Sequence, residues 1–237
     1  MWNERNILMM GEESANLLNN KRVLVIGVGG VGAFAAESIV RAGVGHIVIV
    51  DADEVSESNI NRQLIALHST IGKPKVEVLA ERLRDINPSL DIATIKEYIR
   101  DERTEEVLSI FHYDYIIDAI DTLAPKVFLL YSAVQRNIPI VSSMGSGGKW
   151  DPSRIKIDDI AKSNYCKLAR MVRKRLHHLG VRDGIKVVYS DEVVDHSVVI
   201  ETEGESNKHS NVGTISYMPA IFGCMMASVV IRDLIKI

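Results

Sequence analysis

Hydrophobic positions in the first 143 residues follow two periods that alternate along the chain. Short apolar runs rich in β-branched residues are typical of buried parallel strands, whereas apolar residues at every third or fourth position are typical of helices packed on a sheet. The runs predict strands at residues 23–26, 46–50, 91–95, 113–118 and 138–143, and the longer segments predict helices at residues 32–42, 73–87, 104–111 and 124–136. This alternation predicts an α/β fold: a doubly wound, mainly parallel Rossmann-like sheet with helices on both faces.

The second half of the chain has a less regular pattern. We expect a basic amphipathic helix at residues 168–179, a strand near residues 187–193, a polar loop at 201–213 and a buried helix that includes residues 217–231. The glycines at 145–148 either close over a ligand or form a turn. The last apolar run is shorter than the roughly 18 residues that span a bilayer, so we expect no membrane association. No repeat or long linker is visible, and residues 1–237 are interpreted as a single domain.

Composition, charge and cysteine count argue against some classes of protein but do not identify the function. Apolar residues make up 46% of the chain and charged residues 25%, which is ordinary for a globular domain. A net charge of −3 and a pI of about 6.2 argue against binding nucleic acid by charge alone. The first residues, MWNERNILMMGEE, do not resemble a signal peptide, so we expect a cytoplasmic protein. Cys166 and Cys224 are too few for a four-thiolate zinc site.

Residues 23–53, VLVIGVGGVGAFAAESIVRAGVGHIVIVDAD, have the order of a nucleotide-binding βαβ unit. The turn after the first strand contains Gly27, Gly29, Gly30 and Gly32. Gly27 and Gly29 permit positive φ and close backbone approach, Gly32 lets the helix pack on the strand, and the helix N-terminus attracts a phosphate. Asp51, at the end of the second strand, can accept hydrogen bonds from ribose hydroxyls. The segment predicts a nucleotide site.

Two cations after Asp51 indicate which nucleotide binds. Arg62 lies eleven residues beyond Asp51, and Lys75 lies thirteen beyond Arg62. A dinucleotide cofactor carries only a pyrophosphate, which a helix N-terminus can largely neutralise, whereas a triphosphate and its transition state need further positive charge. The two cations therefore favour ATP.

Five spaced motifs follow one another in the order found in a known superfamily. They are Gly27-x-Gly29-Gly30-x-Gly32, Asp51-x-Asp53, Asn59-x-Asn61-Arg62-Gln63, Lys73-x-Lys75 and Asp118-Ala119-Ile120-Asp121. With these motifs, residues 5–121 resemble the E1-like adenylating enzymes, which include the activators of ubiquitin-like and sulfur-carrier proteins.

The resemblance implies roles for single residues. Arg62 and Lys75 would stabilise negative charge in the transition state, and Asp121 would bind Mg²⁺ beside the phosphates. The implied contacts to the rest of the nucleotide are Gly27, Gly29, Gly30, Gly32, Asp51, Asp53, Asn59 and Gln63. Asn59 could instead cap its own turn, and Asp118 is interpreted as structural.

An arginine near the N-terminus fits the same superfamily. Arg5 precedes Gly11 in the pattern Arg-x-x-x-x-x-Gly. The resemblance implies that this arginine reaches the γ-phosphate of ATP in the neighbouring subunit, and therefore that the protein is a homodimer whose sites are completed in trans.

Within the superfamily, the chain is most similar to the tRNA threonylcarbamoyladenosine dehydratase group. The likeness is carried by INRQLIALHSTIGKPKVEVLAERLRDINP, YIIDAIDTLAPK and GSGGKWDPSRIKIDDIAKS. It implies that ATP adenylates the carboxylate of N6-threonylcarbamoyladenosine in tRNA and that the side chain then cyclises to cyclic t6A. Residues 162–186 carry eight Lys and Arg residues against Asp183 alone, an excess that suits a tRNA backbone. Whether a sulfur-relay partner protein assists is left open.

Two other functions remain open at this stage. One is adenylation of the C-terminal glycine of a ubiquitin-like or sulfur-carrier protein, with Cys166 as the thioester-forming nucleophile. Many activators of that kind carry paired CxxC motifs, which this chain lacks. The other is a nucleotide-binding module without catalysis, and the presence of Arg62, Lys75 and Asp121 disfavours it.

Overall fold

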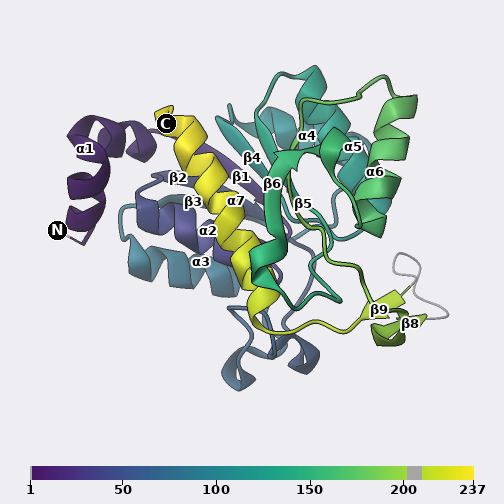
Figure 1. Ribbon diagram of the computed structural model, residues 1–237. Coiled ribbons are helices and arrows are strands. Elements are labelled where there is room, and N and C mark those ends of the chain that lie inside the picture. The colour runs from purple at the N-terminus through teal and green to yellow at the C-terminus, as the bar shows by residue number, and fades with distance from the viewer. Residues whose placement is uncertain (1, 202–209) are drawn as a thin grey trace.

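The computed structural model describes residues 2–201 and 210–237. Within these ranges seven strands form one sheet in the order β3-β2-β1-β4-β5-β7-β6 (Figure 1). The strands are β1 (Arg22–Ile26), β2 (His46–Val50), β3 (Asp91–Ile95), β4 (Tyr115–Asp118), β5 (Ile140–Ser143), β6 (Ile155–Asp159) and β7 (Lys186–Ser190). All neighbours pair in parallel except β6 and β7. The predicted α/β class is confirmed, and the strand order changes direction between β1 and β4, where doubly wound sheets bind ligands.

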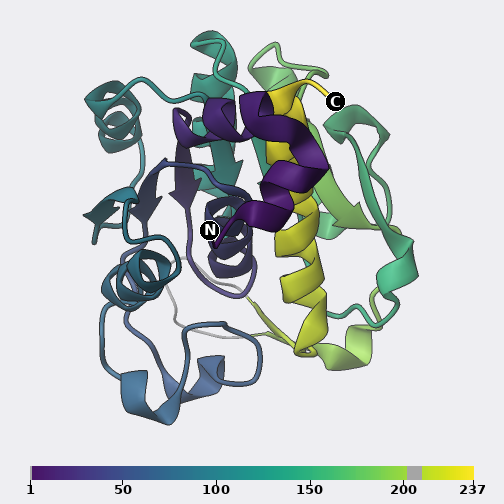
Figure 2. The same ribbon diagram turned by 90° about the vertical axis from the view of Figure 1, so that its left-hand side faces the viewer.

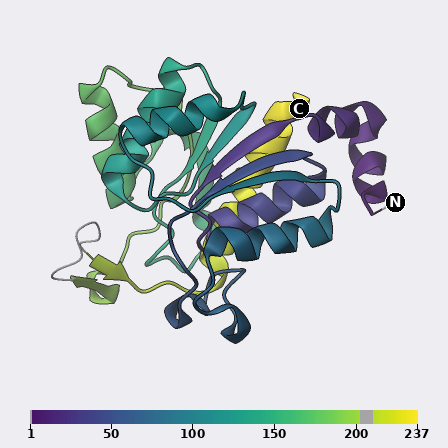
Figure 3. The same cartoon turned by 180° about the vertical axis from the view of Figure 1, so that it is seen from behind.

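Helices cover both faces of the sheet (Figures 1 and 3). One face carries α2 (Gly32–Ala42), α3 (Lys75–Ile86) and α7 (Tyr217–Ile235), and the other carries α4 (Glu102–Ile110), α5 (Leu123–Gln135) and α6 (Lys167–His178). Successive side chains of a strand point to opposite faces, so Val23 and Val25 pack in one buried cluster and Leu24 in the other. Burial on both sides explains why these strands are continuous apolar runs.

The carboxyl ends of the parallel strands lie at one edge of the sheet, here called the carboxyl edge; the opposite edge is called the amino edge. The connection from β2 to α3 lies at the carboxyl edge and contains two short 3₁₀ turns, Glu57–Asn59 and His68–Thr70. The N-terminal end of α7 lies at the same edge (Figure 1). The predicted site residues of the nucleotide segment are therefore gathered at the carboxyl edge.

The sequence pattern did not predict α1 (Glu4–Asn19), β6, or the antiparallel pair β8 (Val199–Glu201) and β9 (Ser210–Val212). In α1 only Leu18 is buried, so most of this helix lies on the surface of the protein. It bends at Gly11, whose φ is 83°, and lies beside the C-terminal end of α7 (Figure 2). The polar loop expected at 201–213 includes β9, and residues 202–209 lie outside the described residues.

Helix α7 is a core helix. Its 19 residues and mean hydropathy of 1.6 would suit a membrane span by length and composition, yet half of it is buried inside the protein. A Cβ atom on Gly223 would lie 2.4 Å from the Val31 carbonyl oxygen, which shows how closely α7 packs on α2. The expected burial of this segment is confirmed.

Candidate active site

The glycine turn after β1 depends on two of its glycines for its shape. Gly27 has a φ of 85°, and a Cβ atom on it would lie 2.7 Å from the Ala119 carbonyl oxygen. A Cβ atom on Gly32 would lie 1.8 Å from the Gly27 carbonyl oxygen, so a side chain there would push α2 off the turn. Gly29 does not have a positive φ, so the expected positive φ at this position is wrong.

Gly30 brings distant segments together. A Cβ atom on Gly30 would lie 3.0 Å from the Pro219 Cβ atom and 3.3 Å from the Arg62 carbonyl oxygen. The start of α7 and the connection after β2 therefore both contact the glycine turn. Local sequence carries no signal for the Pro219 contact, because it joins residues far apart in the chain.

Asp51 ties the glycine turn to β2. One carboxylate oxygen accepts a hydrogen bond from the Val28 backbone N–H (2.7 Å), and the other accepts one from the Asp53 N–H (2.9 Å). Burial raises the pKa of Asp51, an effect that the charge of Lys75 and the two hydrogen bonds oppose. Each carboxylate oxygen can accept a second hydrogen bond, so the predicted contact with a ribose fits the geometry.

Lys75 is a buried cation in this group. Its ammonium Nζ lies 2.7 Å from an Asp53 carboxylate oxygen, and its side chain is 6% exposed whereas that of Asp53 is 69% exposed. The Lys75 backbone N–H also donates to the Asp53 carbonyl oxygen (3.0 Å), which fixes the first residue of α3 against the end of β2. Asp51, Asp53 and Lys75 thus form one cluster at the carboxyl edge. A nucleotide phosphate could replace Asp53 as the partner of the ammonium.

The turn at residues 59–63 places one cation and one amide beside the glycines. The buried Asn59 side chain accepts a hydrogen bond from the Ser56 N–H (3.2 Å), so it caps its own turn. The Arg62 guanidinium donates to the Ser58 carbonyl oxygen and the Asn61 side chain, both at 2.8 Å. The Gln63 side-chain carbonyl oxygen is buried and accepts no hydrogen bond within the described part of the chain. Such an unsatisfied oxygen suits a ligand donor.

The two aspartates after β4 have different surroundings. Asp118 is fully buried, and one of its carboxylate oxygens lies 2.6 Å from both the Lys126 ammonium and the Ser142 hydroxyl. Its other oxygen accepts from the Ile120 N–H (3.0 Å), which shapes the chain that leads to Asp121. Asp121 is exposed and comes two residues after Ala119, the residue that contacts the glycine turn. The structural interpretation of Asp118 is therefore supported by its contacts.

The donor set suits a Mg²⁺ ion that arrives with a nucleotide. Mg²⁺ usually binds one or two protein carboxylates together with substrate phosphates and water. Among residues 2–201 and 210–237, no group of three or more His, Cys, Asp or Glu side chains could hold a metal ion. Asp121 fits the single-carboxylate pattern.

Arg5 lies away from the other predicted site residues of its own chain. It is exposed on α1, and its neighbour Asn6 donates a hydrogen bond to the Arg41 carbonyl oxygen at the C-terminal end of α2. The glycine turn precedes the opposite end of α2, about 15 Å away for a helix of this length. If Arg5 acts in a nucleotide site, that site belongs to another subunit.

Cys166 is buried beside the loop after β5. It is 8% exposed, directly precedes α6, and its Sγ atom would lie 3.8 Å from a Cβ atom on Gly145. Side chains on Gly147 and Gly148 would press against Val212 and Val194. These glycines therefore permit close packing, which is the turn role considered for them.

The basic helix is amphipathic, but Arg173 does not belong to its exposed face. The Arg173 guanidinium donates to the Ile160 and Ser163 carbonyl oxygens and to the Ser163 hydroxyl (3.2, 2.8 and 2.7 Å). The cations exposed on this helix, here called the α6 cations, are Lys167, Arg170, Lys174 and Arg175. Arg173 is one of the eight cations at residues 162–186 that were expected to suit a tRNA backbone, and its bonds instead give it a structural role.

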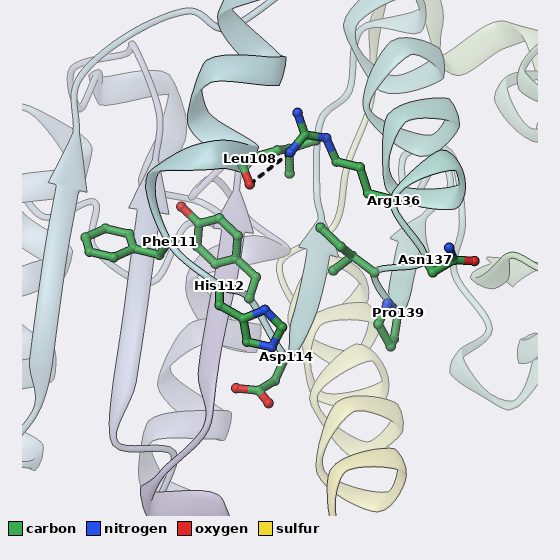
Figure 4. A pocket seen from close by; sticks show the side chains of 9 residues that line it. Leu108, Phe111, His112, Asp114, Arg136, Asn137 and Pro139 are labelled. Atoms are coloured by element: carbon green, nitrogen blue, oxygen red, sulfur yellow. Dashed lines mark hydrogen bonds between the residues drawn. The ribbon is translucent and has the colours of Figure 1, made fainter.

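A surface cavity of about 370 Å³ lies at the amino edge, where β4 and β5 begin (Figure 4). Two charged side chains in its lining are already paired with other groups of the protein. Asp114 accepts from the Lys21 ammonium and the Arg22 N–H, both at 2.8 Å, and Arg136 pairs with Glu105. Ligands of doubly wound sheets bind at the other edge, so this cavity is not the candidate active site.

The carboxyl edge thus has the construction of a nucleotide-binding enzyme of the doubly wound α/β class, with a glycine turn, a buried lysine and exposed carboxylates. The chain belongs to the ThiF family, whose sequence profile matches residues 3–237. It is 39% identical to tRNA threonylcarbamoyladenosine dehydratase of Bacillus subtilis, over 98% of this chain and 94% of that protein. It is 33% identical to the Haemophilus influenzae protein of the same name, over 94% of this chain and 89% of that protein. The structure resembles the Escherichia coli tRNA N6-threonylcarbamoyladenosine dehydratase, TcdA, in complex with ATP, with a TM-score of 0.89, 31% identity, and coverage of 98% of this chain and 93% of that one.

Proposed function

We propose that this protein is an ATP-dependent tRNA threonylcarbamoyladenosine dehydratase, which converts N6-threonylcarbamoyladenosine in tRNA to its cyclic form. Relatives that match nearly the whole chain carry this activity in their names, and one of them was solved with ATP bound. The observation on this chain that carries the proposal is the buried Lys75, held beside Asp51 and the glycine turn at the strand-order switch.

The geometry suggests how ATP lies in the site. The ribose would bind Asp51, and the phosphates would run from the glycine turn toward Lys75 and Arg62. Gln63 would use its unsatisfied carbonyl oxygen for a ligand donor. Asp53 would release the Lys75 ammonium as the phosphates approach, at little cost because the Asp53 carboxylate is already largely solvated.

The reaction needs positioned charge more than covalent help from the protein. A carboxylate oxygen of the modified adenosine attacks the α-phosphorus of ATP, the bond to pyrophosphate breaks, and an acyl adenylate forms. Arg62 and Lys75 would stabilise the charge that moves onto the phosphates. The ureido nitrogen of the same side chain then attacks the activated carbonyl, loses its proton and expels AMP. Because nucleophile and carbonyl belong to one side chain, ring closure is intramolecular.

Asp121 is the residue that we assign to Mg²⁺. The ion would neutralise phosphate charge and help pyrophosphate leave. Asp121 is suited to this role because it is exposed and follows the segment that contacts the glycine turn.

We further propose a homodimer in which Arg5 of each chain reaches the other's ATP. Its place near the far end of α2 in its own chain supports action in trans. Leu8 and Met9 on the same helix are 80% and 87% exposed, which suits a surface that a second subunit covers. Mixing inactive Arg5→Ala and Lys75→Met chains should restore about a quarter of wild-type activity if the chains exchange at random, because one site of each mixed dimer is intact. No recovery after verified exchange would contradict the arrangement.

The tRNA would be held partly by the α6 cations, whose side chains are exposed on one helix. The proposed compartment is the cytoplasm, where ATP and tRNA are available. The proposed reaction does not require a sulfur-relay partner protein. Activation of a carrier protein through Cys166 is less compatible with the structure, because this thiol is buried.

The direct test incubates the purified protein with ATP, Mg²⁺ and tRNA that carries the linear modification. Nucleoside mass spectrometry should show loss of one water from threonylcarbamoyladenosine, with AMP and pyrophosphate formed in equal amounts. Unchanged tRNA under conditions in which the protein binds ATP would contradict the proposal. Transfer of AMP to a carrier protein ending in Gly-Gly would favour the alternative.

A further inference from the structure

Three exposed aromatic side chains flank the loop after β5, residues 144–150. Trp150 is 61% exposed, Tyr165 is 66% exposed and Tyr217 is 39% exposed. Large aromatic groups lose favourable burial when they stay in water, so three around one loop indicate a surface that is covered by a partner.

Contacts between their segments bring the three aromatics to the same part of the carboxyl edge. The Tyr217 hydroxyl donates a hydrogen bond to the Trp150 carbonyl oxygen (2.8 Å). Tyr165 precedes Cys166, whose Sγ atom lies beside Gly145 in the same loop. Trp150 lies at the carboxyl edge because β6, which follows it, begins opposite the last residue of β7.

The backbone around these side chains is held in place. The Trp150 N–H donates to the Glu192 carboxylate (3.0 Å), and so does the Asp151 N–H (2.9 Å). The buried Lys149 ammonium donates to the Glu192 carbonyl oxygen, which also holds residues 149–151 against Glu192. Trp150 is therefore an exposed side chain on a tethered backbone.

Tyr165 has an unusual backbone for its residue type. Its φ is 50°, in the left-handed region that costs a residue with a Cβ atom roughly 1–2 kcal/mol. Backbone strain of this kind is concentrated at active sites and ligand-binding sites. The strained residue is exposed and aromatic, and it lies next to the α6 cations Lys167 and Arg170.

The position of the loop separates it from the nucleotide. Asp51 and Lys75 place the ribose and phosphates over β1 and β2, whereas the loop follows β5, on the other side of the strand-order switch. Pro219, two residues after Tyr217, packs against Gly30 of the glycine turn. The start of α7 therefore connects the aromatic surface to the proposed phosphate site.

We propose that Trp150, Tyr165 and Tyr217 form a stacking surface for unpaired nucleobases of the RNA loop that carries the acceptor. Single-stranded RNA is recognised by stacking of its bases on aromatic side chains, with nearby cations binding the phosphates. Lys167 and Arg170 supply that charge. The inference rests on the proposed function, because it identifies how the same site selects a base in a single-stranded loop.

The test measures binding of an unmodified RNA anticodon stem-loop without ATP. In a Trp2→Phe protein, Trp150 is the remaining tryptophan, and its fluorescence should be quenched by the stem-loop but not by a fully paired duplex of the same stem. Trp150→Ala should weaken stem-loop binding about tenfold, the loss typical of one stacked base, whereas Trp150→Phe should retain most of the affinity. Phe111→Ala is the matched control, since Phe111 is a 38% exposed aromatic at the opposite edge of the sheet.

A second variant removes stacking without adding backbone strain. Asparagine tolerates a positive φ, so Tyr165→Asn should fold normally and still lose several-fold in stem-loop affinity. Equal affinity of wild type, Trp150→Ala and Tyr165→Asn, or equal quenching by the duplex, would overturn the stacking surface.

Ring closure measured on the same proteins separates the two proposals. If the wild type converts the tRNA and Trp150→Ala has the same KM for it, the stacking surface is wrong and the function stands. If the stem-loop quenches Trp150 fluorescence but neither the wild type nor any variant forms the cyclic product, the stacking surface is supported and the proposed function is wrong.

Discussion

The two halves of the carboxyl edge are built in different ways. The nucleotide half, formed by β1, β2, α2 and the start of α3, takes most of its proposed site residues from one continuous segment, from Gly27 to Lys75. The exceptions are Asp121 after β4 and Arg5 of a second subunit. The acceptor half, around the loop after β5, joins that loop to the start of α6, the end of β7 and the start of α7. The proposed contacts with the triphosphate therefore come mainly from local motifs, whereas the proposed acceptor surface depends on packing between distant segments.

The largest effect should be the difference between substitutions of Asp118, which stabilises the fold, and Asp121, which we assign to the reaction. Asp118→Asn leaves the buried Lys126 ammonium without its charge partner, and breaking such a pair costs about 3–5 kcal/mol of unfolding free energy. Asp121→Asn should change stability by only about 0.5 kcal/mol and reduce turnover instead. Denaturant unfolding and initial rates measure both. A stable Asp118→Asn protein, or an unstable Asp121→Asn protein, would contradict this assignment of a structural role to Asp118 and a catalytic role to Asp121.

Local reasoning predicted the parallel strands, the glycine turn and a nucleotide site that includes Asp51 and Lys75, because strand, turn and helix signals fall within a few residues of one another. Asp53 was assigned only through the family resemblance. Local reasoning did not find the antiparallel β6, since a half-exposed edge strand has a weak apolar pattern. It also counted Arg173 among the cations of residues 162–186 that suit a tRNA backbone. The Arg173 guanidinium instead donates to carbonyl oxygens of the 160–163 turn, and no period in the sequence reveals this interaction.

The nucleotide half should lose turnover when either cation is removed. Lys75→Met and Arg62→Ala should fold and bind ATP, yet turn over about a hundredfold more slowly, since one positioned donor contributes roughly 3 kcal/mol in the transition state. Lys96→Met is the matched control for Lys75, because Lys96 forms an exposed pair with Glu54 nearby. A rate near wild type in both site variants would remove these residues from the chemistry.

The acceptor half should respond to charge reversal in a way that the nucleotide half does not. Arg170→Glu with Lys174→Glu should raise the KM for tRNA and leave that for ATP unchanged. The dependence of log affinity on log salt should become less steep by about one unit for each tRNA phosphate that the variant no longer binds. Arg173→Ala should lower the melting temperature instead, because its guanidinium fastens the 160–163 turn. An unchanged salt slope in the double variant would place the tRNA elsewhere.

The smallest effect concerns Asp51. Burial raises its pKa, so the native state binds this proton more tightly than the unfolded chain, and the ionised carboxyl lowers stability above its ordinary pKa of 3.8. That cost disappears as the pH falls through the raised value. The melting temperature of Asp51→Asn minus that of wild type should therefore become more negative between neutral pH and about pH 4. A difference that is constant, or that moves the other way, would show that burial does not dominate at Asp51.

The central claim is that the tRNA carboxylate attacks the α-phosphorus of ATP at the carboxyl edge, and oxygen labelling tests it most directly. Threonylcarbamoyladenosine in tRNA would carry ¹⁸O in both carboxylate positions. The masses of AMP and of the cyclic nucleoside would be measured by mass spectrometry after a single turnover. Because one labelled oxygen bridges to phosphorus and leaves with AMP, the account predicts AMP with one ¹⁸O and a cyclic product that keeps the other. Unlabelled AMP, or ADP with labelled phosphate, would contradict it.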